Sequence, residues 1–206
     1  MRLLLATRNV GKLRELRQLL DGLLAQCLSL DDLDIDIDIP ELGATFADNA
    51  TLKARGYAHL SGLLTLADDS GLEVDALSGA PGVQSARWAG PNASDKDRIR
   101  KLLEQLRGVP PERRTARFRC VVAIATPQSQ VHTAEGSCEG RIIDHPRGSH
   151  GFGYDPVFFF PELGLTMAEL DPDLKNRISH RARAVQAARP ILQTLLAGAE
   201  DGGSSA

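Results

Sequence analysis

The pattern of apolar and polar positions changes its period near the start of the chain, and this change predicts the first two elements. Residues 3–6 form a short apolar run that is typical of a buried strand. From Gly11 onward, apolar residues recur at helical spacing with charged residues between them. Asn9 stands at the junction and is a suitable N-cap. The pattern therefore predicts a strand, a short loop and a helix.

A second buried strand is predicted for residues 63–67, an apolar run bounded by turn formers. It leads directly into two adjacent carboxylates, Asp68 and Asp69, followed by Ser70 and Gly71. Because neighbouring residues of a strand point to opposite faces, both carboxylates can aim at one spot only if the chain turns there, and Gly71 permits such a turn. Carboxylates at the end of a buried strand lie where open α/β sheets bind ligands. The alternative is an ordinary Asp-Asp-Ser-Gly turn.

Further helices and strands follow from the same periodicities. Helices are predicted from Phe46 to about Leu60 and after a capping box at Ser94 and Asp97. The stretch 175–181 opens the last predicted helix, with Ser179 as N-cap, and Pro190 should kink or split this helix. A short helical piece is expected at 166–170. Strands are predicted at 118–125, 130–143 and 157–160.

Residues 32–39 alternate strictly between acidic and apolar positions, which predicts a half-buried strand ending at Pro40. Its row of aspartates could hold a metal ion. We favour a solvated sheet edge whose charges prevent edge-to-edge pairing.

Two stretches have the chemistry of an anion site. Thr7, Asn9 and Lys12 lie between the first strand and the first helix, where oriented N–H groups and a lysine favour phosphate. The spaced glycines of a P-loop are missing, and a capped surface helix is the alternative. Lys53 falls on the apolar stripe of its helix. It either reaches solvent or meets an anion, such as Asp68, Asp69 or a ligand phosphate.

The stretch 148–156 is rich in glycine, and glycines flank Phe152 on both sides. Such a backbone can approach a flat ligand closely, and the ring can stack on it. A glycine-rich hairpin closed by aromatic residues is the alternative.

Composition limits the class of protein. The 206 residues suit one domain, which we place at 1–197, followed by a disordered tail at 198–206. A net charge of −3 argues against binding to nucleic acid polymers. The three cysteines are far apart and indicate a reduced compartment. The N-terminal apolar run is too short for a signal peptide, and no stretch has the ~20 apolar residues that cross a membrane. We expect a cytoplasmic protein.

Several motifs occur in an order that resembles the inosine triphosphate pyrophosphatase family and together span nearly the whole chain. They are Thr7-x-Asn9-x-x-Lys12, the run from Glu41 to Ala54, Ala67-Asp68-Asp69-Ser70-Gly71-Leu72, Gly79-x-Pro81-Gly82, Ser85-Ala86-Arg87-Trp88, Gly151-Phe152-Gly153-Tyr154-Asp155-Pro156 and Lys175-x-x-Ile178-Ser179-His180-Arg181. The resemblance implies an α/β fold with an elongated mixed central sheet and flanking helices, two lobes around a substrate cleft, and a homodimer.

The resemblance also implies Mg²⁺-dependent hydrolysis of the non-standard purine triphosphates ITP, dITP and XTP to monophosphate and pyrophosphate. By analogy Asp69 is the general base and Lys53 supports catalysis. Glu41 and Asp69 are the expected Mg²⁺ ligands, with Asp68 as a supporting acid. The expected substrate-binding residues are Thr7, Arg8, Asn9, Val10, Gly11, Lys12, Lys53, Ser70, Phe152, Gly153, Tyr154, Asp155, Lys175, His180 and Arg181.

Within that set, we assign recognition of the base to His180, Arg181 and nearby backbone, with Phe152 stacking on the ring. Two alternatives remain at this point. One is a pyrophosphatase of the septum-formation-inhibitor type that acts on modified or pyrimidine nucleotides. The other is a nucleotide-binding module without hydrolytic activity.

Overall fold

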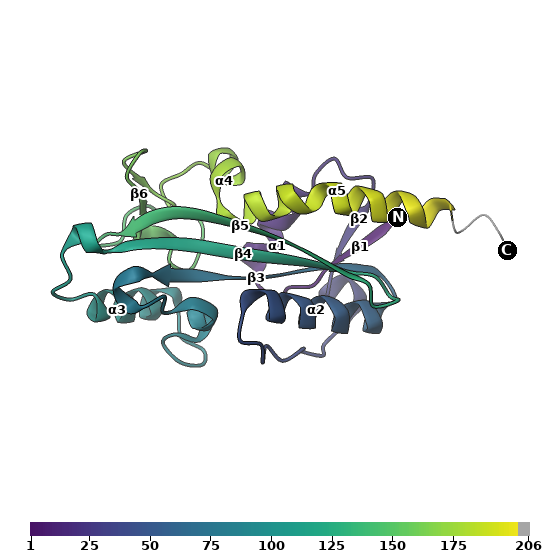
Figure 1. Ribbon diagram of the computed structural model, residues 1–206, viewed down its shortest axis with the longest axis horizontal. Helices are drawn as coiled ribbons and strands as arrows, with labels where there is room; N and C mark the ends of the chain where they lie inside the picture. The colour runs from purple at the N-terminus through teal and green to yellow at the C-terminus, as the bar shows by residue number, and fades with distance from the viewer. Residues whose placement is uncertain (202–206) are drawn as a thin grey trace. The chain divides into compact units, whose positions relative to one another are not determined.

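The computed structural model describes residues 1–201, which form a mixed α/β fold (Figure 1). Within this described part, the strands form a seven-stranded sheet in the order β2-β1-β3-β4-β5-β6-β7. They are β1 (Arg2–Leu5), β2 (Gln26–Ser29), β3 (Leu64–Val74), β4 (Thr115–Ala125), β5 (Val131–Ile142), β6 (Phe158–Phe160) and β7 (Leu165–Thr166). β1 pairs in parallel with β2 and β3, whereas β6 pairs antiparallel with β5 and β7. The predicted mixed α/β class is confirmed.

The α-helices are α1 (Val10–Leu19), α2 (Phe46–Ser61), α3 (Asp95–Gln105), α4 (Pro172–Ile178) and α5 (His180–Asp201). The chain divides into two compact units, and β3, β4 and β5 each contribute to both. Unit 1 contains residues 1–69, 120–136 and the described residues from Arg181 on; unit 2 contains 70–119 and 137–180. The single domain expected at 1–197 stays a prediction.

Unit 1 is built around the buried leucines of β1. Leu3 and Leu5 are fully buried and pack with apolar residues of α1, β3, β4 and α5. Helices α2 and α5 lie on opposite faces of the long strands (Figure 1). The predicted first strand and helix are confirmed, and the Asn9 side chain caps α1 by accepting a hydrogen bond from the Lys12 amide.

Unit 2 has its own core. Leu72, Leu102, Phe118 and Phe158 are buried in it together with apolar residues of β5, and partly buried residues of α4 pack against it. Helix α3 begins with the predicted capping box, in which the side chains of Ser94 and Asp97 bind each other's backbone amides. This capping box determines where α3 begins, and the apolar face of the helix packs against the core.

The strand predicted at 32–39 is wrong. A 3₁₀ helix covers Asp31–Leu33, Asp34 is left-handed at φ 52°, and the chain is irregular from there to residue 45. Its polar backbone groups find side chains in place of a neighbouring strand: the Tyr57 hydroxyl donates to the Ile37 carbonyl at 3.0 Å, and Arg8 donates to the Ile35 carbonyl at 2.8 Å. Alternation of side chains is a local pattern and does not supply a pairing partner.

The expectations for the C-terminal part of the chain have different outcomes. Residues 166–170 are not helical, because Thr166 pairs in β7 with Phe159. Helix α5 begins at His180, directly after the extended Ser179 that was predicted as its N-cap, whereas Lys175 lies on the separate helix α4. Pro190 lies inside α5 without splitting it, and the alternative that it kinks the helix stays a prediction. α5 continues to Asp201, past the predicted boundary at residue 197, and residues 202–206 of the predicted tail lie outside the described residues.

Within residues 1–201, none of the helices has both the length and the apolar composition required to span a membrane.

Candidate active site

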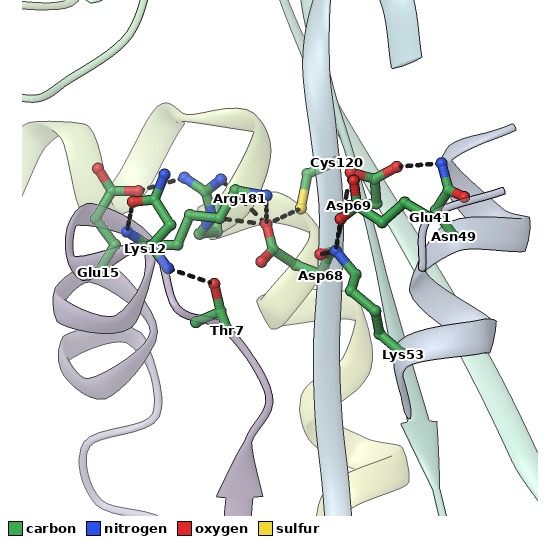
Figure 2. Close-up of polar contacts among 11 residues, drawn as sticks. Thr7, Lys12, Glu15, Glu41, Asn49, Lys53, Asp68, Asp69, Cys120 and Arg181 are labelled. Carbon is green, nitrogen blue, oxygen red and sulfur yellow. Dashed lines mark hydrogen bonds and ion pairs between the residues drawn. The ribbon is translucent and has the colours of Figure 1, made fainter. Parts of the chain in front are cut away.

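The two adjacent aspartates lie on opposite faces of one uninterrupted strand. β3 runs through Asp68, Asp69, Ser70 and Gly71 to Val74, so the turn considered for Gly71 does not occur. Figure 2 shows the consequence: Asp68 points toward α1 and Arg181, whereas Asp69 points toward Glu41, Asn49 and Lys53. The alternation of a strand therefore divides the pair into two sites.

Asp68 is the centre of a buried ion network, which we define as Lys12, Glu15, Asp68 and Arg181 (Figure 2). Asp68 is fully buried, and its Oδ2 lies 3.0 Å from Lys12 Nζ and 3.1 Å from Arg181 Nη2. Arg181 Nη1 also donates to Glu15 Oε2. Cys120 Sγ lies 3.9 Å from Asp68 Oδ2. The network joins residues from α1, β3 and α5.

The network keeps Asp68 and Arg181 charged. Burial disfavours the Asp68 carboxylate, but the charges of Lys12 and Arg181 outweigh it and hold the Asp68 pKa well below its usual range. Burial likewise disfavours the Arg181 guanidinium, yet Asp68 and Glu15 raise its pKa. Burial, with the nearby Asp68 charge, raises the pKa of the Cys120 thiol to about 12, so this cysteine remains protonated. Two cations and two anions balance one another.

The start of α1 delivers Lys12 to this network. Asn9 Oδ1 accepts from the Lys12 amide at 3.0 Å, and Thr7 Oγ1 accepts from the Asn9 amide at 3.2 Å. The Lys12 side chain is 14% exposed, so it forms the accessible edge of an otherwise buried network. Of the other predicted residues in this loop, Arg8 is bound to Asp38 at 2.6 Å, and Val10 is exposed.

Helix α2 presents the residues that surround Asp69. Thr45 and Asp48 form a capping box that fixes the start of this helix. Asn49 and Lys53 follow one turn apart on one face, as i, i+4 neighbours do. Asn49 Nδ2 donates to Asp69 Oδ2 at 3.0 Å, and Lys53 Nζ lies 4.0 Å from Asp69 Oδ1.

Lys53 contacts anionic groups, which was one of the two predicted alternatives for this residue. Its Nζ donates to Glu41 Oε1 at 2.7 Å and to the Asp68 carbonyl at 2.6 Å. Burial lowers the Lys53 pKa, but the charges of Asp68, Asp69 and Glu41 outweigh this effect, so the pKa is raised overall. Burial raises the pKa of Asp69, with Lys53 opposing part of that effect. Asp69 is thus a carboxylate with raised basicity beside a permanent cation.

Glu41 and Asp69 are the two carboxylates that could hold a metal ion. Among residues 1–201, no group of three or more His, Cys, Asp or Glu side chains is arranged to hold one. Mg²⁺ in nucleotide enzymes, however, usually takes one or two carboxylates and completes its shell with water and phosphate oxygens. Two hard oxygen donors that share Lys53 fit that requirement. Asp68 is not brought to this pair, because it lies on the other face of β3.

The glycine-rich loop of unit 2 positions Phe152. The Phe152 amide donates to Asp155 Oδ2 at 3.0 Å, and Lys175 Nζ lies 2.6 Å from the same oxygen. Lys175 Nζ also lies 5.2 Å from the centroid of the half-buried Phe152 ring. Asp155 and Lys175 are both buried. They therefore fix the backbone and the ring of Phe152.

The remaining predicted residues of unit 2 have structural contacts. Tyr154 is buried, and its hydroxyl donates to the Ser85 carbonyl at 2.9 Å. The His180 ring stacks on Phe118 with centroids 4.7 Å apart. Ser70 is half-buried on β3.

Several residues of these clusters were missed as site residues. Glu15 lies three positions after Lys12 on α1, so helical spacing could have suggested that both reach one site. Asn49 stood inside a motif of the resemblance. Cys120 and Asp95, whose carboxylate accepts from the Gly153 amide, gave no sequence signal, since their partners are distant in sequence.

Comparisons with known proteins identify the family of this chain. A dITP/XTP pyrophosphatase from Desulforamulus reducens is 54% identical over 195 residues, covering 95% of this chain and 97% of the relative. One from Bacillus subtilis is 44% identical and covers 92% and 96%. The solved structure of a HAM1 protein from Coxiella burnetii has a TM-score of 0.83 at 43% identity and covers 96% of this chain and 99% of its own. A family model described as the Ham1 family matches residues 3–191. The chain belongs to the Ham1 family.

Proposed function

We propose that the protein hydrolyses the non-standard purine nucleoside triphosphates dITP, ITP and XTP to the monophosphate and pyrophosphate. The observation that carries this proposal is the 54% identity, over 95% of the chain, with a relative named as a dITP/XTP pyrophosphatase. The residue chemistry of the candidate active site supports it in three respects: it supplies groups that bind phosphate, a general base for the attacking water, and groups that recognise the purine.

Unit 1 supplies the groups for a polyanion. The start of α1, with the loop residues Thr7 and Asn9 that cap it and the ammonium group of Lys12, is the place we assign to phosphate, since helix N-termini favour anions. Lys53 adds a second ammonium from α2. Phosphoryl transfer depends mainly on positioning and charge neutralisation. These cations, held in place by carboxylates, suit that task.

Asp69 is proposed as the general base. It is buried, its pKa is raised, and Asn49 fixes the orientation of its carboxylate. It orients a water molecule and accepts its proton as the oxygen attacks the α-phosphorus, and pyrophosphate leaves. A bound Mg²⁺ would be held by Glu41 and Asp69 and would neutralise charge on the phosphate oxygens.

Unit 2 supplies a surface for the base. Phe152 stacks on the purine, and donors near His180 pair with the keto oxygen at C6. Adenine presents an amino group at that position, so a donor would face a donor, at a cost of about 1–3 kcal/mol for each group left unpaired. Arg181, which we expected to contribute, has its guanidinium bound to Asp68 and Glu15 instead.

The alternatives are less well supported. A nucleotide-binding module without activity would be expected to lack the carboxylate base, and Asp69 is present with its partners. The septum-formation-inhibitor type is not favoured, because the relatives reported above are named as dITP/XTP pyrophosphatases.

We further propose that the protein acts in the cytoplasm as a homodimer that binds neither membranes nor nucleic acid polymers. Among residues 1–201, Cys27, Cys120 and Cys138 form no disulfide, which is consistent with a reducing compartment. The homodimer follows from the family resemblance and is tested by light scattering during size-exclusion chromatography.

A nucleotide panel tests the proposal. Pyrophosphate release is measured with dITP, ITP, XTP, ATP, GTP and CTP, with Mg²⁺ and after its removal by EDTA. We expect kcat/KM for the three non-standard purines to exceed that for ATP by more than ~10²-fold and to collapse without Mg²⁺. ATP within about tenfold of ITP would contradict the donor pocket. A preference for pyrimidine nucleotides would favour the septum-formation-inhibitor type.

A further inference from the structure

We propose that Asp95, at the start of α3, is a positioning residue for the nucleotide base. It holds the backbone that carries Phe152, although it belongs to none of the motifs of the family resemblance. The inference rests on the proposed function, in which Phe152 stacks on the purine. It concerns residues of unit 2 alone.

The contact is a hydrogen bond between a carboxylate and a backbone amide. The Gly153 amide donates to Asp95 Oδ2 at 2.7 Å. The preceding amide, that of Phe152, donates to Asp155 Oδ2 at 3.0 Å. Two consecutive amides are therefore each bound to a carboxylate, and charge-assisted bonds of this kind are stronger than those between neutral groups. The backbone of the stacking residue is held on both sides.

The conformation of this loop explains why such bonds are needed. Residues 151 and 153 are glycines with left-handed φ values of 77° and 63°, so no regular element orders the chain around Phe152. A Cβ at position 151 would lie 2.0 Å from Asp155 Oδ2. The glycines allow the close approach of the carboxylate, but they also leave the loop with large conformational freedom. Side-chain acceptors restrict that freedom.

Asp95 is itself held on a rigid element. Arg98 Nη2 lies 2.6 Å from Asp95 Oδ1, and Arg98 Nη1 donates to the Ala86 carbonyl at 2.7 Å. Helix α3 is anchored in the core by Ile99 and Leu102. The Asp95 side chain is 43% exposed, so its removal leaves no buried cavity, and we expect its variants to fold.

Loss of the bond between Asp95 and the Gly153 amide should affect binding of the nucleotide base but not binding of the phosphate groups. Without Asp95, the peptide at Gly153 can rotate, and the Phe152 ring spends less time in the stacking position. Binding of the base then weakens. Binding of phosphate groups, which we assign to residues of unit 1, is unchanged. A general loss of structure would weaken both.

The experiment compares Asp95→Ala with Glu104→Ala. Both variants remove one carboxylate from α3, but Glu104 is an exposed residue of the last turn and lies outside the capping box at the start of the helix. Two ligands are titrated by calorimetry: inosine monophosphate, which carries the base, and inorganic triphosphate, which does not. Steady-state kinetics with dITP accompany the titrations.

We expect Asp95→Ala to weaken inosine monophosphate binding and raise the KM for dITP by about tenfold, the scale of one lost charge-assisted bond. Inorganic triphosphate binding should stay within about twofold, and Glu104→Ala should change the binding of neither ligand. Equal losses for both ligands, equal effects of both variants, or no effect of Asp95→Ala would overturn the inference. Failure of the proposed function appears separately, as a wild-type protein that does not hydrolyse dITP.

Discussion

Asp68 and Asp69 have the same side chain and adjacent positions, yet their surroundings give them opposite properties. Asp68 accepts from Lys12 and Arg181, and its pKa is lowered. Asp69 accepts a hydrogen bond from Asn49 and lies 4.0 Å from Lys53, and its burial raises its pKa. A carboxylate that stays charged can balance the buried cations around it, whereas a carboxylate with a raised pKa is suited to accept a proton.

For Asp69→Asn, we expect kcat to fall by ~10²-fold or more, because the variant cannot accept the proton of the attacking water. The fold should be kept, since burial already disfavours the Asp69 charge that the variant removes. Single-turnover rates at saturating Mg²⁺ and thermal melting measure the two effects. Retention of more than roughly a third of wild-type kcat would remove Asp69 from its proposed role.

For Asp68→Asn, the expected defect is one of stability. The variant leaves Lys12 and Arg181 with one anion, Glu15, in a buried network, and breaking such a network by removing one partner costs about 3–5 kcal/mol. Urea unfolding measures this cost. As a control, Asp75→Asn removes one of the two carboxylate partners of Arg117 at the surface, where the Asp75 side chain is 45% exposed, and should cost less than about 1 kcal/mol. Equal losses for the two variants would contradict the buried network.

The sequence predicted the members of the site better than their contacts. Asp68, Asp69, Lys12 and Lys53 were all expected near a ligand, and the inward position of Lys53 followed from its place on the apolar stripe. The division of the aspartates was not predicted, because Gly71 allowed a turn that the chain does not make. Contacts such as those of Arg181 depend on folding and leave no local pattern.

At the scale of elements, helices could be predicted more reliably than strands. α1, α2 and α3 have both apolar periodicity and capping residues within a few positions, so the information is local. The strand expected at 32–39 is wrong and β2 was missed, since a strand needs a partner that its own sequence does not specify. The helical piece predicted at 166–170 is wrong for the same reason, since Thr166 pairs with a neighbouring strand.

An ion pair in unit 2 gives a prediction for pH. Arg147 binds Glu169 at 2.7 Å, and this bond is the main cause that lowers the Glu169 pKa from 4.5 to about 2. A carboxylate whose pKa is lowered by folding stabilises the native state above its unfolded pKa, and this contribution is lost as pH falls toward the folded pKa. Glu169→Gln should therefore melt below wild type at pH 7, and the gap should narrow between pH 4.5 and pH 3. A gap that is constant with pH would contradict this assignment.

At the scale of the whole molecule, an acidic chain is proposed to bind a highly charged anion. The net charge of −3 gives no general attraction for phosphate. Two local cations of unit 1, Lys12 and Lys53, supply the positive charge that the phosphate groups need, and both are held by carboxylates. Because each of these cations has an anionic partner within the protein, the fold tolerates both charges.

Hydrolysis of dITP in ¹⁸O-labelled water tests the central claim most directly, because it reports the bond that the protein breaks. If Asp69 directs water to the α-phosphorus, mass spectrometry will find the label in deoxyinosine monophosphate and none in pyrophosphate. The Asp69→Asn variant serves as the control for background hydrolysis. Label in orthophosphate or in pyrophosphate would contradict the proposed reaction.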